Sequence, residues 1–164
     1  MFVICDPTNK KILQIRTTNL EDPNIRCIEL PDTHEAALHP GWYKLNVSQT
    51  GLEVDLDAVK WEKITTLSDE TTKFIESHYP PQRQQTLSFL LIGAISSNPP
   101  LLQRATYIQN GLNWGFTVLA WYYQHKNVIL SLSSKDHVVT YNWNFSTLPP
   151  DPIASIEVAL GIST

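Results

Sequence analysis

Two apolar stripes at helical spacing run through the stretch between Pro99 and His125. The first, in alternating steps of four and three residues, consists of Leu101, Ala105, Ile108, Leu112, Gly115, Leu119 and Tyr122. The second lies on a neighbouring face and consists of Tyr107, Gly111, Trp114, Val118 and Trp121. Proline is tolerated in the first turn of a helix, where its missing N–H has no partner. The pattern therefore predicts one long helix, apolar over a wider surface than contact with a single core requires.

Alternation of apolar and polar residues predicts strands in the first part of the chain. The expected strands are Phe2–Cys5, Lys11–Arg16, Ile25–Leu30, Trp42–Val47 and Leu52–Leu56. Strong turn formers separate the first pair and the last pair, so each pair predicts an antiparallel hairpin. One helical turn is expected between residues 32 and 41, before a proline stops it. Residues 1–66 are therefore expected to form a β-rich N-terminal domain.

The apolar period becomes helical near Ser68, which suits an N-cap position with two acidic residues in the first turn. The helix is expected to end at Tyr79, where a double proline follows, and Pro81 then starts a second helix. The second helix is expected to run antiparallel to the long helix and to meet its first stripe through Leu87 and Leu91. Residues 67–127 are thus predicted to be a helical region.

The last part of the chain returns to a β-like pattern. Val128–Leu130 and His137–Trp143 flank a polar turn, which predicts a third hairpin. Ile156–Ile162 alternates as a strand does, but the preceding Asp151 and Pro152 also suit the start of a helix, so both interpretations stay open. Residues 128–164 are expected to form a β hairpin and tail packed on the rest. The fold class predicted from these elements is α+β.

Composition narrows the possible partners. Hydrophobic residues make up 42% of the chain and charged residues only 17%, below the ~25% of ordinary globular domains. The formal net charge is −4, which offers no clustered cations for nucleic acid. No uninterrupted apolar run reaches the ~18 residues that a membrane span needs. Such a charge-poor chain leaves uncharged surface for permanent protein contacts.

No reactive constellation stands out in the sequence. Five histidines lack metal-ligand spacing, and Pro40 prevents a sustained helix through the weak cluster of His34, Glu35 and His39. Cys5 and Cys27 fall in separate predicted strands and are expected to be free thiols. Nucleophile elbows are missing and the glycines are too scattered for a phosphate loop. We therefore predict no catalytic, cofactor-binding or metal-binding residue and no enzyme activity.

The aromatic residues carry the remaining functional information. Tryptophan and tyrosine are enriched at the hot spots of protein interfaces. The predicted interface on the long helix consists of Tyr107, Gly111, Trp114, Val118, Trp121 and Tyr122. Flat aromatic rings also stack on sugars, so a carbohydrate-binding module that recognises a receptor glycan is the alternative.

Three segments in this order also carry a resemblance: FVICDPTNKKIL, KFIESHYPPQRQQTLSFLL and ATYIQNGLNWGFTVLAWYYQ. The chain resembles small tailed-bacteriophage proteins that are associated with tail fibres and baseplates. The resemblance implies a non-enzymatic virion component or a tail-fibre assembly chaperone. It also implies an oligomer, bound to a tail fibre or baseplate protein, located in the virion tail or in the host cytoplasm during assembly. No catalytic residue follows from it.

Overall fold

The computed structural model describes residues 1–19, 22 and 24–152. The predicted α+β class is confirmed, with two small antiparallel sheets and four α-helices among these residues. The chain divides into two compact units. The first comprises Met1–Lys63 and Ser131–Tyr141, and the second, helical unit comprises Ile64–Leu130 and Asn142–Thr164. The described residues of the predicted C-terminal section, 128–164, thus fall in both units, with 131–141 in the first and 128–130 and 142–152 in the second.

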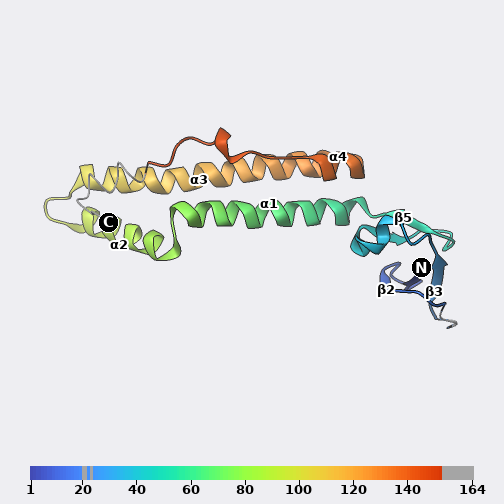
Figure 1. Ribbon diagram of the computed structural model, residues 1–164. Helices are drawn as coiled ribbons and strands as arrows, with labels where there is room; N and C mark the ends of the chain where they lie inside the picture. The colour runs from blue at the N-terminus through green and yellow to red at the C-terminus, as the bar shows by residue number, and fades with distance from the viewer. Residues whose placement is uncertain (20–21, 23, 153–164) are drawn as a thin grey trace. The chain divides into compact units, whose positions relative to one another are not determined.

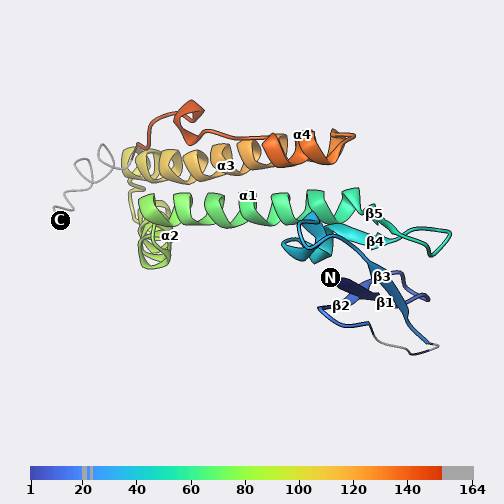
Figure 2. The same cartoon turned by 45° about the vertical axis from the view of Figure 1, so that its right-hand side comes forward.

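A three-stranded antiparallel sheet opens the first unit. Its strands are β1 (Phe2–Cys5), β2 (Ile12–Arg16) and β3 (Arg26–Glu29), in the spatial order β2-β1-β3 (Figure 2). They confirm the first three predicted strands. Ile4 is opposite Cys27 in the ladder, and Cys5 is opposite Arg26. Because successive side chains of a strand point to opposite faces, the two free thiols lie on opposite faces of the sheet.

A second, two-stranded sheet of β4 (Tyr43–Leu45) and β5 (Leu52–Val54) confirms the second predicted hairpin. Two short 3₁₀ helices, η1 (Glu35–Ala37) and η2 (Pro40–Trp42), precede it, and η1 is the helical turn expected there. Leu45 is fully buried in one hydrophobic cluster with residues of β1. Both sheets of this unit therefore share a core.

The first long helix, α1 (Leu56–His78), begins well before Ser68, so the predicted start of this helix is wrong. Asp55 caps the helix instead, because its carboxylate accepts a hydrogen bond from the backbone N–H of Ala58 at 3.4 Å. Residues 52–56 alternate between apolar and polar side chains, which is typical of a strand and gave no sign that a helix begins at Leu56. This alternation extended the predicted strand to Leu56, which is the first residue of the helix.

The next two helices, α2 (Pro81–Ser96) and α3 (Leu102–Ser131), confirm the predicted pair that is bounded by double prolines. In the connection between them, the hydroxyl of Ser97 donates to the carbonyl of Ala94 at 2.8 Å. It also accepts the backbone N–H of Leu101 at 3.1 Å. The chain reverses direction here, so that α3 runs back past α2 (Figure 1).

The predicted hairpin at residues 128–143 is wrong. Val128–Leu130 belongs to α3, and the fourth helix, α4 (Lys135–Thr140), takes up most of the second expected strand. Ser134 caps α4, because its hydroxyl accepts the backbone N–H of His137 at 3.3 Å. An apolar run of three or four residues fits a strand and a helical turn equally well, and here the cap and the buried Ile129 favour the helix.

The segment after α4 follows α3 in the opposite direction in both views and contains one more 3₁₀ helix, η3 (Phe145–Thr147) (Figures 1 and 2). We call residues 142–152 the C-terminal segment. The indole N–H of Trp143 donates to the Glu70 carboxylate of α1 at 2.7 Å, which attaches the start of this segment. Ile156–Ile162, for which strand and helix both stayed open, lies outside the described residues.

The core of the helical unit lies between its three long helices. Its buried members are Tyr79, Leu87, Ile108, Trp114 and Val118. Contact between Leu87 of α2 and the first stripe of α3 was predicted, and the presence of Ile108 in this cluster agrees with it. No helix in the described part of the chain is long and apolar enough to cross a membrane.

Candidate functional site

The six residues predicted as an interface lie mainly inside the helical unit. Gly111, Trp114, Val118 and Trp121 are buried, and Tyr107 and Tyr122 are half-buried. The indole N–H of Trp114 donates to the carbonyl of Pro149 at 2.9 Å. That of Trp121 donates to the hydroxyl of Thr147 at 3.1 Å. The C-terminal segment therefore covers the tryptophan face of α3.

Ring stacking strengthens this cover. Phe145 of the C-terminal segment stacks on Phe74 of α1, with ring centroids 4.5 Å apart and planes 10° apart. The same ring lies 4.8 Å from the Trp121 ring. Aromatic pairs at such distances stabilise packing beyond the area that they bury. The two tryptophans of α3, Trp114 and Trp121, thus contact this chain's own C-terminal segment.

A histidine and a carboxylate meet at the end of the C-terminal segment. Asp151, whose side chain is 8% exposed, lies 2.9 Å from Nδ1 of His78 and accepts the hydroxyl of Tyr79 at 2.7 Å. The His78 ring lies beside Phe74 and Trp114, with centroids 4.9 Å and 5.1 Å away. One carboxylate oxygen of Asp151 contacts His78, the last residue of α1, and the other contacts Tyr79, which follows it. These two bonds hold the C-terminal segment against the end of α1.

A second polar cluster lies in the first unit. The carboxylate of Glu35 accepts hydrogen bonds from the ammonium of Lys135 and from the hydroxyl of Tyr43, the latter at 2.6 Å. Hydrogen bonding to Lys135, and then to Tyr43, lowers the pKa of Glu35. The same carboxylate raises the pKa of Lys135, while burial, followed by the bond to Glu35, raises the pKa of Tyr43.

These shifts suit a structural contact. Each favours the protonation state that the group already has at neutral pH, so neither the amine nor the phenol is activated as a nucleophile. The side chains of His34, Glu35 and His39 do not point to a common site. Nδ1 of His34 accepts the backbone N–H of Ala36, and the ring of His39 stacks on that of Trp42 with centroids 3.8 Å apart. No group of three or more potential metal ligands was found among the described residues.

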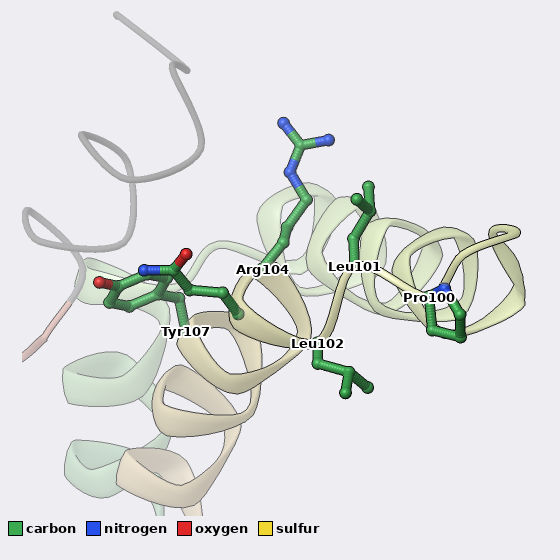
Figure 3. A pocket seen from close by; sticks show the side chains of 6 residues that line it. Pro100, Leu101, Leu102, Arg104 and Tyr107 are labelled. Carbon is green, nitrogen blue, oxygen red and sulfur yellow. The ribbon is translucent and has the colours of Figure 1, made fainter.

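The start of α3 carries a shallow hollow of about 560 Å³. Its lining residues are Pro100, Leu101, Leu102, Gln103, Arg104 and Tyr107. Figure 3 shows Leu101 and Arg104 pointing one way and Leu102 pointing the other. A ligand site needs polar groups that converge on one point, and these do not.

A second hollow has the character of a binding surface. We call it the apolar groove; its volume is about 320 Å³ and all three long helices line it. The lining residues are Ile75 and Tyr79, then Gln84, Leu87 and Ser88 of α2, and Gly111, Leu112, Gly115, Phe116 and Leu119 of α3. Phe116 is 66% exposed and Leu119 is 41% exposed. Large apolar side chains therefore remain accessible on one side of α3.

The double proline explains where the groove lies. Pro80 and Pro81 end α1 and start α2, so α2 does not continue along α1 and a corner forms opposite α3. Gly115 deepens this corner from the α3 side. A Cβ atom placed on Gly115 would meet no atom within 4 Å outside its own local helix, so packing among the described residues does not require a glycine here.

Charged residues are scarce in the sequences of α2 and α3. No carboxylate occurs in the sequence between Glu76 and Asp136, and no ionisable side chain occurs between Arg83 and Arg104. Soluble helical surfaces normally carry charged residues of both signs. The outer surfaces of α2 and α3 therefore combine low charge with exposed apolar side chains.

The interface residues predicted on α3 are mainly buried, whereas the exposed apolar side chains beside the groove belong to another side of this helix. Leu119 was expected to pack on the preceding helix, and Phe116 was not singled out, yet both line the groove. The absence of ionisable residues between Arg83 and Arg104 is a signal in the sequence for the α2 side of this surface. The burial of Trp114 and Trp121 depends on Thr147 and Pro149 of the C-terminal segment, which follow the predicted hairpin and were expected to form the tail.

Comparisons with known proteins assign this chain to no family. No protein-family model, no curated protein and no solved structure matches this chain.

Proposed function

We propose that this protein is a non-enzymatic assembly component of a bacteriophage tail, which binds a tail fibre or baseplate protein through the apolar groove. The single observation that carries the binding role is the exposure of Phe116 and Leu119 beside a groove lined almost entirely by uncharged residues. The assignment to a phage tail rests on the resemblance of the hairpin, the double-proline segment and the tryptophan-bearing helix.

A groove favours a partner of different shape. Two identical concave surfaces cannot fill one another, whereas a protruding apolar segment of another protein can. Helix-in-groove recognition of this kind uses an amphipathic helix whose apolar side enters the groove. A segment with large aliphatic residues on one side would bury Leu119 and Phe116 and lie against Gly115.

The polar clusters support a role without catalysis. Glu35 and Asp151 hold segments of the chain together, and the pKa shifts of Lys135 and Tyr43 favour their unreactive forms. Carbohydrate binding, the alternative, gains no support from the long helix, since the rings of Trp114 and Trp121 are buried.

Co-expression with each fibre and baseplate protein of the same phage tests the proposal. We expect one of them to co-purify with the tagged full-length chain. Gly115→Gln places a polar side chain in the groove and should reduce this affinity at least about tenfold. The matched control is Leu102→Gln, which changes an exposed residue outside the groove and should leave binding unchanged.

Two results would refute this role. One is a wild-type chain that binds none of the fibre and baseplate proteins. The other is a Gly115→Gln variant that binds the partner as tightly as the wild type does.

A further inference from the structure

The outer side of α2 is a second exposed apolar surface, separate from the groove. Phe89 is 65% exposed and Ile92 is 61% exposed, while Leu87 and Ala94 on the inner side are buried. Residues three and four apart share a side of a helix, so Gly93 lies one turn from Phe89 on this outer surface. We call Phe89, Ile92 and Gly93 the outer α2 face.

Nothing in the described part of the chain requires a glycine at position 93. It is exposed in the middle of α2, and a Cβ atom at this position would meet nothing within 4 Å outside its own local helix. A glycine inside a helix is unfavourable compared with alanine. Its presence makes sense where another helix approaches closely.

We infer that α2 pairs with α2 of a second copy of this chain, antiparallel and related by a two-fold axis. In that arrangement Phe89 of each copy lies over Gly93 of the other. A two-fold contact requires a surface that is complementary to itself. Phe89 and Gly93, one helical turn apart, meet this requirement, because the Phe89 ring of each copy fills the space above Gly93 of the other copy.

The charge pattern favours a second copy over a charged partner. A two-fold axis brings each side chain of the face near its own equivalent or near a close neighbour, so charged residues would repel one another. None of the residues 84–103 is ionisable. Gln85 and Ser96 continue the line of Phe89 and Ile92 at helical spacing, and both are uncharged.

The exposed area sets the strength of the contact. A phenylalanine side chain buries on the order of 150–250 Å², so Phe89 and Ile92 together offer roughly 250 Å² per copy. This is well below the ~800 Å² per partner of a standard interface. The dimer should therefore be weak and depend on protein concentration.

Sedimentation velocity of the full-length chain over a wide concentration range tests the inference. The wild type should shift from monomer to dimer as concentration rises. Gly93→Gln fills the vacant position and should raise the dimer dissociation constant at least about tenfold. The same substitution removes a helical glycine, so the melting temperature should stay the same or rise, which separates lost pairing from lost folding.

A swap of the two positions tests the geometry itself. Phe89→Ala alone should weaken the dimer, and Phe89→Ala combined with Gly93→Phe should restore it, because the ring and the small residue then exchange places in both copies. Two outcomes would overturn the inference: a wild type that stays monomeric at every concentration, or a Gly93→Gln variant that dimerises as well as the wild type.

The dimer and the groove are tested independently. Gly115→Gln should leave the sedimentation of the chain unchanged, and Gly93→Gln should leave capture of the fibre or baseplate protein unchanged. Failure of the dimer therefore leaves the proposed function standing, and failure of capture leaves the dimer standing.

Discussion

Trp114 illustrates how a residue typical of interfaces becomes part of a core. Its indole N–H bonds the carbonyl of Pro149, and its ring lies 5.4 Å from that of Tyr79. Only 5% of the residue is exposed. Its energetic role is therefore in folding the helical unit.

Trp114→Ala should destabilise the helical unit by about 3–5 kcal/mol, the usual cost of removing a large aromatic side chain from a core. Urea denaturation followed by far-ultraviolet circular dichroism measures this change. Leu102→Ala in the same helix is the control, because Leu102 is 69% exposed and its loss should cost less than about 0.5 kcal/mol. Equal stability of the two variants would contradict the burial of the indole.

The two cysteines should differ in reactivity. Burial, with the neighbouring Cys27 thiol as a second cause, raises the pKa of Cys5 to about 11, so its reactive thiolate is scarce at neutral pH. Cys27 is half-buried on the other face of the sheet. A thiol reagent at pH 8 should label Cys27 in the folded protein and reach Cys5 only after denaturation. Rapid labelling of both thiols without denaturant would contradict this assignment.

At the scale of elements, α4 is attached by a salt bridge whose effect depends on pH. The pKa of Glu35 is lowered, so its stabilising contribution is complete above its ordinary pKa and disappears as pH falls through the lowered value. The pKa of Lys135 is raised, so its contribution is complete below its ordinary pKa and disappears as pH rises through the raised value. The attachment should be strongest between about pH 4.5 and 10.5.

Replacement of the ammonium tests this contact directly. In Lys135→Met the pKa of Glu35 should rise toward its ordinary value, because the hydrogen bond that lowers it most is lost. Carboxyl titration by nuclear magnetic resonance measures the shift. Lys11→Met removes an exposed cation elsewhere in the same unit and should leave the Glu35 titration unaltered. An unchanged Glu35 pKa in Lys135→Met would show that the two groups do not interact.

Elements with strong local signals could be predicted from the sequence. The double prolines located both ends of α2, and turn formers located the hairpins. Short apolar runs without such signals could not be assigned, because Val128–Leu130 and residues 137–140 fit strand and helix alike. Ser134, which caps α4, and Asp55, which caps α1, are common turn residues and are recognised as caps only once the backbone is known.

The apolar surface of α3 shows the same limit for the candidate site. Periodicity placed two stripes on this helix, and it could not determine which stripe the rest of the chain covers. Tertiary contacts decided that question, because Thr147 and Pro149 bond the tryptophan stripe and leave Phe116 exposed. The position of a segment far along the chain is not encoded in the local pattern.

On the scale of the whole molecule, each unit has its own hydrophobic core, and the helical unit carries the surfaces that we propose for assembly. The groove suits a protruding segment of another protein, and the outer α2 face suits a second copy. Apart from Ile75, the residues of both surfaces lie between Glu76 and Asp136, a stretch that carries no carboxylate. Low charge over such a length is consistent with surfaces that become covered in an assembly.

Hydrogen–deuterium exchange of the full-length chain, with and without the fibre or baseplate protein, tests whether the partner binds in the groove. We expect slower exchange on binding in the two peptides that line the groove, residues 75–88 and 111–119. The strands of the first unit should exchange as before. Protection confined to those strands, with unchanged exchange along the groove, would refute binding in the groove.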